Sequence, residues 1–233
     1  MSTLYIVATP IGNLQDITFR ALETLKAVGV VACEDTRRTL TLLTHFNIKV
    51  KLLSCRSENE KFAGRKVIDA LNHGLDVAYA SDAGTPAVSD PGAVLARLAW
   101  SAGHKVVPIP GASAFSALVS VACGMDKTVV FEGFLSPRAG RRKARLKELL
   151  ASGAAFVLYE SPFRVVKLFG DLAEFDSERF VCLGREMTKI HEEYIRGSSA
   201  DVFKTLTERD VQDGKLKGEF AVYVSGKPDA ALN

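Results

Sequence analysis

Four loops rich in polar and turn-forming residues each follow a short apolar run. The densest, "SDAGTPAVSDPG" (81–92), combines two aspartates, two serines and a threonine with two glycines and two prolines. The others are "TPIGNLQD" (9–16), "EDTRRT" (34–39) and "PGASA" (110–114). Each loop taken alone can simply shape a turn, as Gly and Pro commonly do. Four such loops together indicate a pocket lined by carboxylates, hydroxyls and backbone groups.

The apolar runs that precede these loops have the length of β-strands. They cover residues 4–9, 29–34, 50–54, 76–81 and 105–110, and stretches of helical periodicity separate them. This alternation is typical of parallel βα units, whose ligands bind beyond the carboxyl ends of the strands. The first half is therefore predicted to be an open α/β sheet. In the segment after 81–92, we expect Asp90 to be the N-cap of a helix that Gly103 ends.

The second half has a different pattern. The strand-like segments "RFVCLGRE" (179–186) and "EEYIRGS" (192–198) follow each other without a helix between them, which indicates a mixed sheet with antiparallel pairs. We therefore predict the α/β class with two tandem domains: 1–114 with a parallel sheet and 115–233 with a mixed sheet.

Composition restricts the class of protein further. A chain of 233 residues with 47% hydrophobic residues can bury a sizeable core, and a net charge of +3 does not indicate a general polyanion binder. The four cysteines form no C-x-x-C pair, and no histidine pair has metal-ligand spacing. No run approaches the roughly 20 apolar residues of a membrane span. We expect a cytoplasmic protein without a metal and without a membrane partner.

The sequence lacks the common nucleotide-binding motifs. It contains neither G-x-G-x-x-G after the first strand nor G-x-x-x-x-G-K-[ST], which argues against a dinucleotide site and a P-loop. The segment "GASAF" (111–115) approaches the G-x-S-x-G elbow, so a serine hydrolase with Ser113 as nucleophile and His191 as base is an alternative. Phe115 stands where that tight turn requires a small residue.

A dense group of cations lies between residues 138 and 147. Six Lys and Arg residues fall within ten positions, with no acidic residue among them, which predicts salt-dependent binding to phosphates. A solvated helix face is the alternative. Further arginines border the expected pocket. The candidate RNA-binding residues are Arg37, Arg38, Arg138, Arg141, Arg142, Lys143, Arg145 and Arg164, and Lys147 belongs to the same cationic group.

Eight motifs in order resemble one enzyme family. They are "ATPIGNLQDIT" (8–18), "CEDTRRT" (33–39), "SDAGTPAVSDPG" (81–92), "PIPGASA" (108–114), "FEGFL" (131–135), "YESPFR" (159–164), "REMTKIHEE" (185–193) and "KGEF" (217–220). The sequence resembles the tetrapyrrole methylase superfamily, and within it the ribosomal RNA small-subunit methyltransferase I family. The resemblance covers nearly the whole chain.

The resemblance implies two αβα domains with S-adenosylmethionine bound in a cleft between them, and a homodimer. The implied reaction is 2′-O-methylation of a cytidine ribose in the decoding region of 16S ribosomal RNA, as naked RNA or within the small ribosomal subunit. A tetrapyrrole or other small-molecule methyltransferase is the alternative within the superfamily. The implied cofactor-binding residues are Pro10, Asp82, Ala83, Gly84, Thr85, Pro86, Ser113, Ala114, Phe134 and Ala221.

Methyl transfer to a hydroxyl oxygen also requires a proton acceptor. Glu34 and Asp35 are the first candidates, because they follow the second strand at the same edge as the other loops. Glu160, Lys189 and Glu192 are further candidates. The sequence departs from the family where relatives have a His-rich H-x-H-N-E segment: it has "CRSENE" (55–60), which keeps Asn59 and Glu60. The resemblance therefore does not imply a role that depends on those histidines for this chain.

Overall fold

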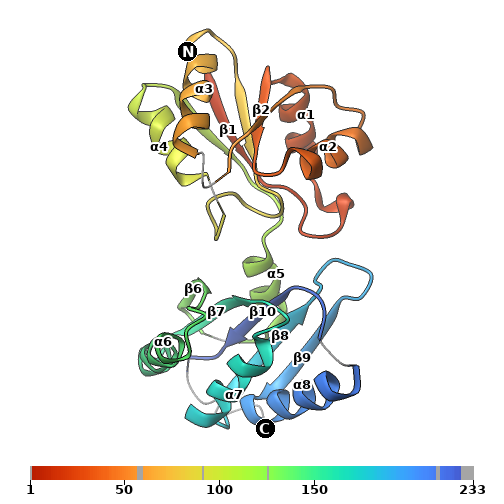
Figure 1. The fold of residues 1–233 in the computed structure, drawn as a ribbon, viewed down its shortest axis with the longest axis vertical. Helices are drawn as coiled ribbons and strands as arrows, with labels where there is room; N and C mark the ends of the chain where they lie inside the picture. The colour runs from red at the N-terminus through yellow and green to blue at the C-terminus, as the bar shows by residue number, and fades with distance from the viewer. Residues whose placement is uncertain (1, 57–59, 91, 125, 214–215, 227–233) are drawn as a thin grey trace. The chain divides into compact units, whose positions relative to one another are not determined.

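The computed structural model describes residues 2–56, 60–90, 92–124, 126–213 and 216–226 (Figure 1). The chain divides into two compact units, Met1–Ser113 and Ala114–Asn233. Asn59 and Pro91, which belong to the motifs "CRSENE" and "SDAGTPAVSDPG", lie outside the described residues. The described residues contain no helix that is long and apolar enough to cross a membrane.

The first unit contains a five-stranded sheet in the order β3-β2-β4-β1-β5, and every neighbouring pair is parallel. This confirms the predicted parallel sheet. Its strands are β1 (Thr3–Val7), β2 (Val30–Cys33), β3 (Lys51–Ser54), β4 (Val77–Ala80) and β5 (Lys105–Ile109). β2 and β4 are buried along their whole length, as expected for central strands covered on both faces.

Helices cover both faces of this sheet (Figure 1). Their bounds are α1 (Phe19–Ala27), α2 (Thr36–His45), α3 (Glu60–Asn72) and α4 (Ala93–Ser101), with a short 3-10 helix η1 (Leu14–Asp16) before α1. Alternate strand residues point to opposite faces. Val7 and Val31 pack with Leu25 of α1 and Leu43 of α2. Leu4, on the other face, belongs to a core with residues of α3 and α4. The unit is therefore an αβα sandwich.

The starts of the helices follow local capping chemistry, with one correction. The Thr18 hydroxyl accepts a hydrogen bond from the Ala21 N–H at 3.1 Å, and the Asp35 carboxylate accepts one from the Arg37 N–H at 2.9 Å. The prediction that Asp90 caps α4 is wrong. The N-cap position is occupied by Gly92, so no side chain caps the helix. Gly92 has φ 132°, a conformation that glycine adopts without strain. The helix thus begins later than expected, and the Asp90 carboxylate does not serve as its cap.

The second unit contains a mixed sheet in the order β6-β7-β10-β8-β9. β6 and β7 are parallel, whereas β10 is antiparallel to β7 and β8, and β8 is antiparallel to β9. The strands are β6 (Val129–Phe134), β7 (Ala155–Glu160), β8 (Phe180–Arg185), β9 (Glu193–Ser198) and β10 (Phe220–Val224). The expected mixed sheet is confirmed, including the antiparallel pairing of β8 with β9.

Helices also cover both faces of the mixed sheet. One face packs against three helices in a core that includes Leu146, Phe169 and Leu206, and the other packs against a single helix through Leu118. The three helices are α6 (Ala139–Ala151), α7 (Val165–Phe175) and α8 (Ser199–Asp213), and the single one is α5 (Ala114–Val121). Both units thus have the αβα layering predicted from the sequence.

Candidate functional site

The loops after β1 and β4 are joined by backbone hydrogen bonds. Thr9 and Gly84 form an isolated antiparallel bridge, with N–H to O distances of 2.9 and 3.0 Å. The Thr9 hydroxyl donates to the Ser81 carbonyl at 3.1 Å, and the Ser81 hydroxyl donates to the Gly84 carbonyl at 3.0 Å. Two loops that are more than 70 residues apart in sequence therefore form one structure.

This edge is the topological switch point of the first sheet. β1 and β4 are neighbours, but α1, which follows β1, and α4, which follows β4, lie on opposite faces of the sheet (Figure 1). In open α/β sheets, the connecting loops diverge at such a point and leave a crevice where ligands bind. The position of the site follows from the strand order.

The loop after β5 approaches closely because two positions lack a side chain. The Thr85 hydroxyl donates to the Ala112 carbonyl at 3.1 Å, which ties the third loop to the first two. A Cβ on Gly84 would lie 3.2 Å from Ile11 Cγ2, and one on Gly111 would lie 3.0 Å from Ala8 Cβ. Gly84 also has φ +78°. A side chain at Gly84 would be strained and would crowd the turn.

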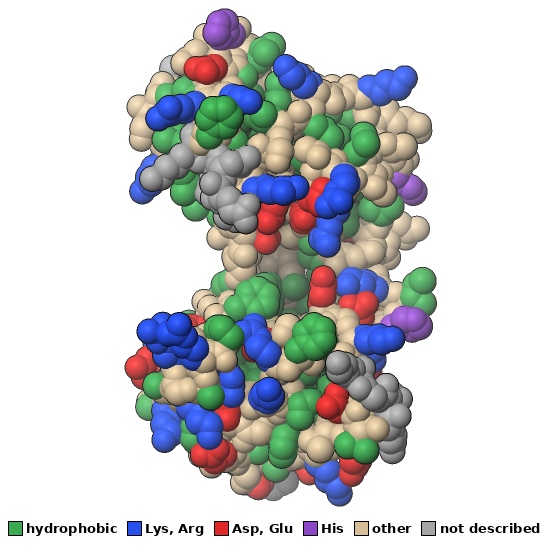
Figure 2. Space-filling model, viewed as in Figure 1, with side chains coloured by type: hydrophobic (Ala, Val, Ile, Leu, Met, Phe, Trp, Pro, Cys, Tyr) green, Lys and Arg blue, Asp and Glu red, His purple; other side chains and the backbone are tan. Residues whose placement is uncertain are grey.

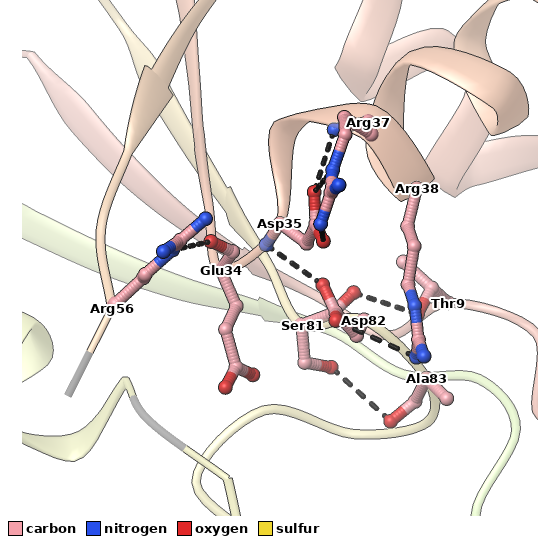
Figure 3. Close-up of polar contacts among 9 residues, drawn as sticks. All are labelled: Thr9, Glu34, Asp35, Arg37, Arg38, Arg56, Ser81, Asp82 and Ala83. Atoms are coloured by element: carbon pink, nitrogen blue, oxygen red, sulfur yellow. Dashed lines mark hydrogen bonds and ion pairs between the residues drawn. The ribbon is translucent and has the colours of Figure 1, made fainter.

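The loop after β2 is attached through the Asp82 carboxylate (Figure 3). One oxygen accepts a hydrogen bond from the Asp35 N–H at 2.9 Å, and the other lies 3.5 Å from Arg38 Nη1. Asp82 keeps 20% of its side-chain surface exposed. All four polar loops that the sequence predicted to share an edge are therefore linked by hydrogen bonds within the first unit.

The two first candidates for the proton acceptor have opposite electrostatics. Burial, and then the negative charge of Asp82, raise the pKa of the Glu34 carboxyl. Hydrogen bonds from the Arg37 guanidinium and backbone N–H hold the pKa of Asp35 well below its usual range. Figure 3 shows the Glu34 carboxylate pointing away from the other drawn residues, while its carbonyl accepts from Arg56 at 3.4 Å. The Asp35 carboxylate is thus held by its contacts as a helix cap. The Glu34 carboxylate has no such ion pair among the described residues, which leaves it available to accept a proton.

Asp90 is a fourth carboxylate at this edge, and its sequence pattern did not indicate a role other than helix capping. Burial, followed by the negative charges of Glu34 and Asp82, raises its pKa to about 6. An Asp-Pro-Gly sequence before a helix normally indicates a cap, so the sequence pattern assigned Asp90 to capping and not to the site. No cation of the described part of the chain pairs with its carboxylate to oppose this shift.

The remaining base candidates are held in ion pairs or hydrogen bonds of the second unit. Glu160 is buried, and its carboxylate accepts from Arg164 and from the Ser161 N–H, each at 2.7 Å. Lys189 bridges two glutamates, and the Glu192 carboxylate accepts from the Thr188 N–H. These contacts give all three residues structural roles.

The cofactor residues expected in the second unit lie around a group of aromatic rings. The ring of Phe131 lies 5.3 Å from Phe115 and 5.0 Å from Tyr159, and Phe134 lies 5.8 Å from Tyr159. Phe134 is 56% exposed, which suits contact with a planar ligand. Ala221 is buried, so its own side chain does not form an accessible surface.

The remaining expected cofactor residues differ in how far they are exposed. Ser113 ends the first unit and Ala114 begins α5 in the second, and both are half-buried. Pro10 and Pro86 are buried, whereas Ala83 is exposed in the turn.

The cationic helix is less available to a partner than its sequence indicates. Arg142 is buried in α6, and its Nε lies 2.7 Å from the Asp171 carboxylate of α7. Lys143 pairs with Glu174, and Arg145 pairs with Glu132 and Glu148. The buried Arg142 cannot reach a phosphate, so its assignment to RNA binding is wrong. Lys and Arg side chains still gather over α6 in Figure 2, and Arg138 and Arg141 are exposed.

A family model matches most of the chain, and solved structures share its fold. The model of the tetrapyrrole (corrin/porphyrin) methylases matches residues 3–202. A uroporphyrin-III C-methyltransferase from Thermus thermophilus superposes with a TM-score of 0.63 at 19% identity, covering 97% of this chain and 95% of its own. A cobalt precorrin-4 methyltransferase superposes with a TM-score of 0.68 at 18% identity, covering 96% of this chain and 94% of its own. At these identities the structural similarity establishes the fold, which is that of a two-domain methylase.

Curated relatives show to which group within this family the chain belongs. The ribosomal RNA small subunit methyltransferase I of Borrelia garinii is 46% identical over 95% of this chain and 98% of its own. The protein of the same name from Thermotoga maritima is 41% identical over 97% and 100%. The chain therefore belongs to the tetrapyrrole methylase family, and within it to the ribosomal RNA small subunit methyltransferase I group. This membership decides against the serine hydrolase alternative for Ser113.

Proposed function

We propose that this protein transfers a methyl group from S-adenosylmethionine to the ribose 2′-hydroxyl of a cytidine in the decoding region of 16S ribosomal RNA. The observation that carries the proposal is the near full-length similarity to ribosomal RNA small subunit methyltransferase I proteins at 41–46% identity. The linked loops of the first unit support it, since they provide a polar cradle at the switch point of a methylase fold.

The chemistry of these loops suits S-adenosylmethionine. Residues 9–13, 81–86 and 110–113 include no Lys or Arg, so the cradle favours a ligand without phosphate. The Asp82 carboxylate is partly exposed and has more acceptor sites than its contacts within the chain occupy, so it can accept from ribose hydroxyls or from an ammonium group. In the second unit, the exposed ring of Phe134 offers a surface for a planar base. When bound, this cofactor supplies an electrophilic methyl group on a sulfonium.

Glu34 is the residue that we assign as proton acceptor. Its carboxylate lies at the same edge as the cradle, and its raised pKa makes it a stronger base than an ordinary glutamate. Asp35 instead fixes the start of α2 and orients Arg37. The side chain of Arg37 is 84% exposed and that of Arg38 is 67% exposed. Both can contact RNA phosphates while Glu34 faces the hydroxyl.

The first test uses two glycines that share a backbone conformation. Gly84→Ala places a methyl group in the cradle at a position with φ +78°. Gly74→Ala is the control: this position lies outside the cradle and has φ +85°, and nothing lies within 4 Å of the new Cβ. Both changes should lower the free energy of unfolding by about 1–2 kcal/mol. Only Gly84→Ala should raise the Kd for S-adenosylmethionine, by tenfold or more in a calorimetric titration. Equal affinities in the two variants would remove the cradle from the site.

The second test identifies the acceptor. Radiolabelled S-adenosylmethionine is incubated with the protein and small ribosomal subunits that lack this modification, and the labelled nucleotide is mapped. We expect one 2′-O-methylated cytidine in 16S ribosomal RNA. Label on a tetrapyrrole substrate and none on RNA would favour the small-molecule methyltransferase instead. Homodimer formation remains a prediction that sedimentation of the purified protein can test.

A further inference from the structure

The loop that joins β8 to β9 is fastened to a second segment of the chain. This loop, residues 186–192, is called the β8–β9 loop below. Glu186 N–H donates to the Glu219 carbonyl at 2.9 Å, and Glu219 N–H donates to the Glu186 carboxylate at 2.8 Å. The Lys189 ammonium lies 2.8 Å from the Glu186 carboxylate and 3.0 Å from that of Glu219. Two strand connections are thereby locked together.

The loop is also ordered from within. Lys189 N–H donates to the Glu186 carbonyl at 3.0 Å, and Glu192 N–H donates to the Lys189 carbonyl at 3.1 Å. Met187 is buried in the core beneath the loop. Glu186 and Thr188 have φ values of 48° and 68°, which non-glycine residues rarely adopt. Such conformations persist where the surrounding structure enforces them, often at functional positions.

Gly218 is part of the same construction. It has φ +111°, and a Cβ at this position would lie 2.6 Å from Glu186 Cγ. The missing side chain makes room for the carboxylate that fastens the loop. The motifs "REMTK" and "KGEF", which are distant in the sequence, therefore form one structural element.

This rigid element presents Ile190 to solvent. The isoleucine is 97% exposed at the tip of the loop. A single exposed apolar residue is ordinary on a protein surface. Here, however, ion pairs and enforced backbone conformations hold the residue in place, although it contributes nothing to the core. The arrangement is one that favours contact with a partner molecule.

The surface beside Ile190 favours an anionic partner. A hollow of about 360 Å³ is lined by Arg185, Glu186, His191, Lys217 and Gly218. Three glutamates around it already have cationic partners: Lys189 holds Glu186 and Glu219, and Arg185 and Arg209 hold Glu193. The carboxylate of a fourth, Glu192, accepts a hydrogen bond from the Thr188 N–H. Lys217 and His191 are exposed and, over the residues that the structure covers, form no ion pair. The Lys217 ammonium at this hollow is therefore available to a ligand.

We infer that the β8–β9 loop and Lys217 form a substrate contact, in which Ile190 packs against a base or sugar of the RNA and Lys217 and His191 face its phosphates. Aliphatic side chains can pack against nucleic acid bases, and lysines neutralise nearby phosphates. The combination of one rigid apolar tip with an unpaired lysine fits a nucleotide chain better than an apolar protein surface. This inference rests on the proposed function and assigns positioning residues, without a role in the chemical step.

The test compares Ile190→Ser and Lys217→Ala with two matched controls. Val211→Ser removes an aliphatic side chain that is 79% exposed on α8, and Lys204→Ala removes an exposed lysine of the same helix. Methyl transfer to unmodified small ribosomal subunits is measured against subunit concentration. We expect KM for the subunit to rise at least fivefold in each test variant, with kcat within twofold of the wild type. The controls should change neither constant.

Two further measurements distinguish an RNA contact from a role in folding or in cofactor binding. The Kd for S-adenosylmethionine and the melting temperature should be unchanged in Ile190→Ser, because the side chain has no core contacts. Lys217→Ala should also reduce the slope of log affinity against log salt by about one.

Three outcomes decide between the RNA contact and the proposed function. If the wild type methylates subunits and both test variants keep KM within twofold, the RNA contact is wrong while the proposed function stands. If the wild type does not methylate RNA, the proposed function is wrong, and the RNA contact that rests on it is wrong as well. If Ile190→Ser changes the sedimentation of the protein alone, the loop is a contact between copies of this chain, which also overturns the RNA assignment.

Discussion

At the scale of single residues, neighbouring carboxylates at one sheet edge have different tasks because their surroundings differ. Asp35 is fixed by Arg37 and caps a helix, while Asp82 joins two loops. The carboxylates of Glu34 and Asp90 have no comparable ion pair within the described residues, and burial raises the pKa of both. Environment, more than residue type, therefore distinguishes the acids held by hydrogen bonds and ion pairs from those whose pKa is raised by burial.

This distinction predicts different kinetics for two conservative substitutions. Glu34→Gln removes the assigned base, so kcat should fall by about 100-fold or more with the KM for subunits little changed. Asp35→Asn keeps an acceptor for the start of α2 and should retain kcat within about threefold. Single-turnover methyl transfer at saturating subunit measures both. A wild-type rate in Glu34→Gln would transfer the role to another group, with Asp90 the next to test.

The wild-type pH profile gives an independent check on Glu34. A base must be deprotonated to act, and the pKa of Glu34 is raised. The rate should therefore fall as pH decreases through this raised pKa, at a higher pH than an ordinary glutamate would give. In Glu34→Gln this acid limb should disappear.

At the scale of elements, α6 shows how a charged helix can be divided between structure and binding. Arg142 faces inward, where it pairs with Asp171 of α7, and Arg145 pairs with Glu132 of β6. Arg138 and Arg141 point to solvent and have no ion pair in the part of the chain that is described. These two arginines, together with the exposed Lys147, are therefore available to neutralise phosphates.

The division predicts which arginines affect RNA affinity. Replacing Arg138 and Arg141 with alanine should weaken binding to small ribosomal subunits and reduce the slope of log affinity against log salt by about 1–2. Arg145→Ala should change that slope much less, because its charge is already balanced by two glutamates. Filter binding between low and physiological salt measures the slopes. If Arg145→Ala had the larger effect, the ion pairs of α6 would have to open on RNA.

At the scale of the whole molecule, the site has a cost in stability. A carboxyl whose pKa is higher in the folded protein than in the unfolded chain favours folding at low pH and loses that contribution as pH rises. The pKa of Asp90 is raised to about 6 from an ordinary value of 3.8. Its contribution is complete below about pH 4 and is lost by about pH 6. At neutral pH the protein therefore folds with a partly desolvated charge.

Removing this charge should stabilise the protein. Asp90→Asn is expected to increase the free energy of unfolding at pH 8 by about 1 kcal/mol, a value reduced from the full shift because the group is partly exposed. The gain should shrink as the pH falls from about 6 to about 4. Urea denaturation across this range measures it, with the exposed Asp69→Asn as control. A gain that does not depend on pH would show that titration of Asp90 is not its source.

Much of this protein was determined by local sequence. Apolar runs of strand length and helical periodicity depend on neighbouring residues, so they predicted the two α/β units and the mixed second sheet. The parallel βα pattern also predicted that the four polar loops would share one edge, because the carboxyl ends of parallel strands meet there.

Only the tertiary structure decided which polar groups are already occupied. The burial of Arg142 depends on Asp171, which comes 29 residues later, and the role of Asp82 depends on Asp35, 47 residues earlier. Asp90 has the sequence pattern of a cap, but Gly92 takes that place in the fold. Ion pairing and desolvation depend on distances in space between residues far apart in the sequence. Local patterns therefore predicted the elements and their order, whereas the packed fold decided which charges remain free to act.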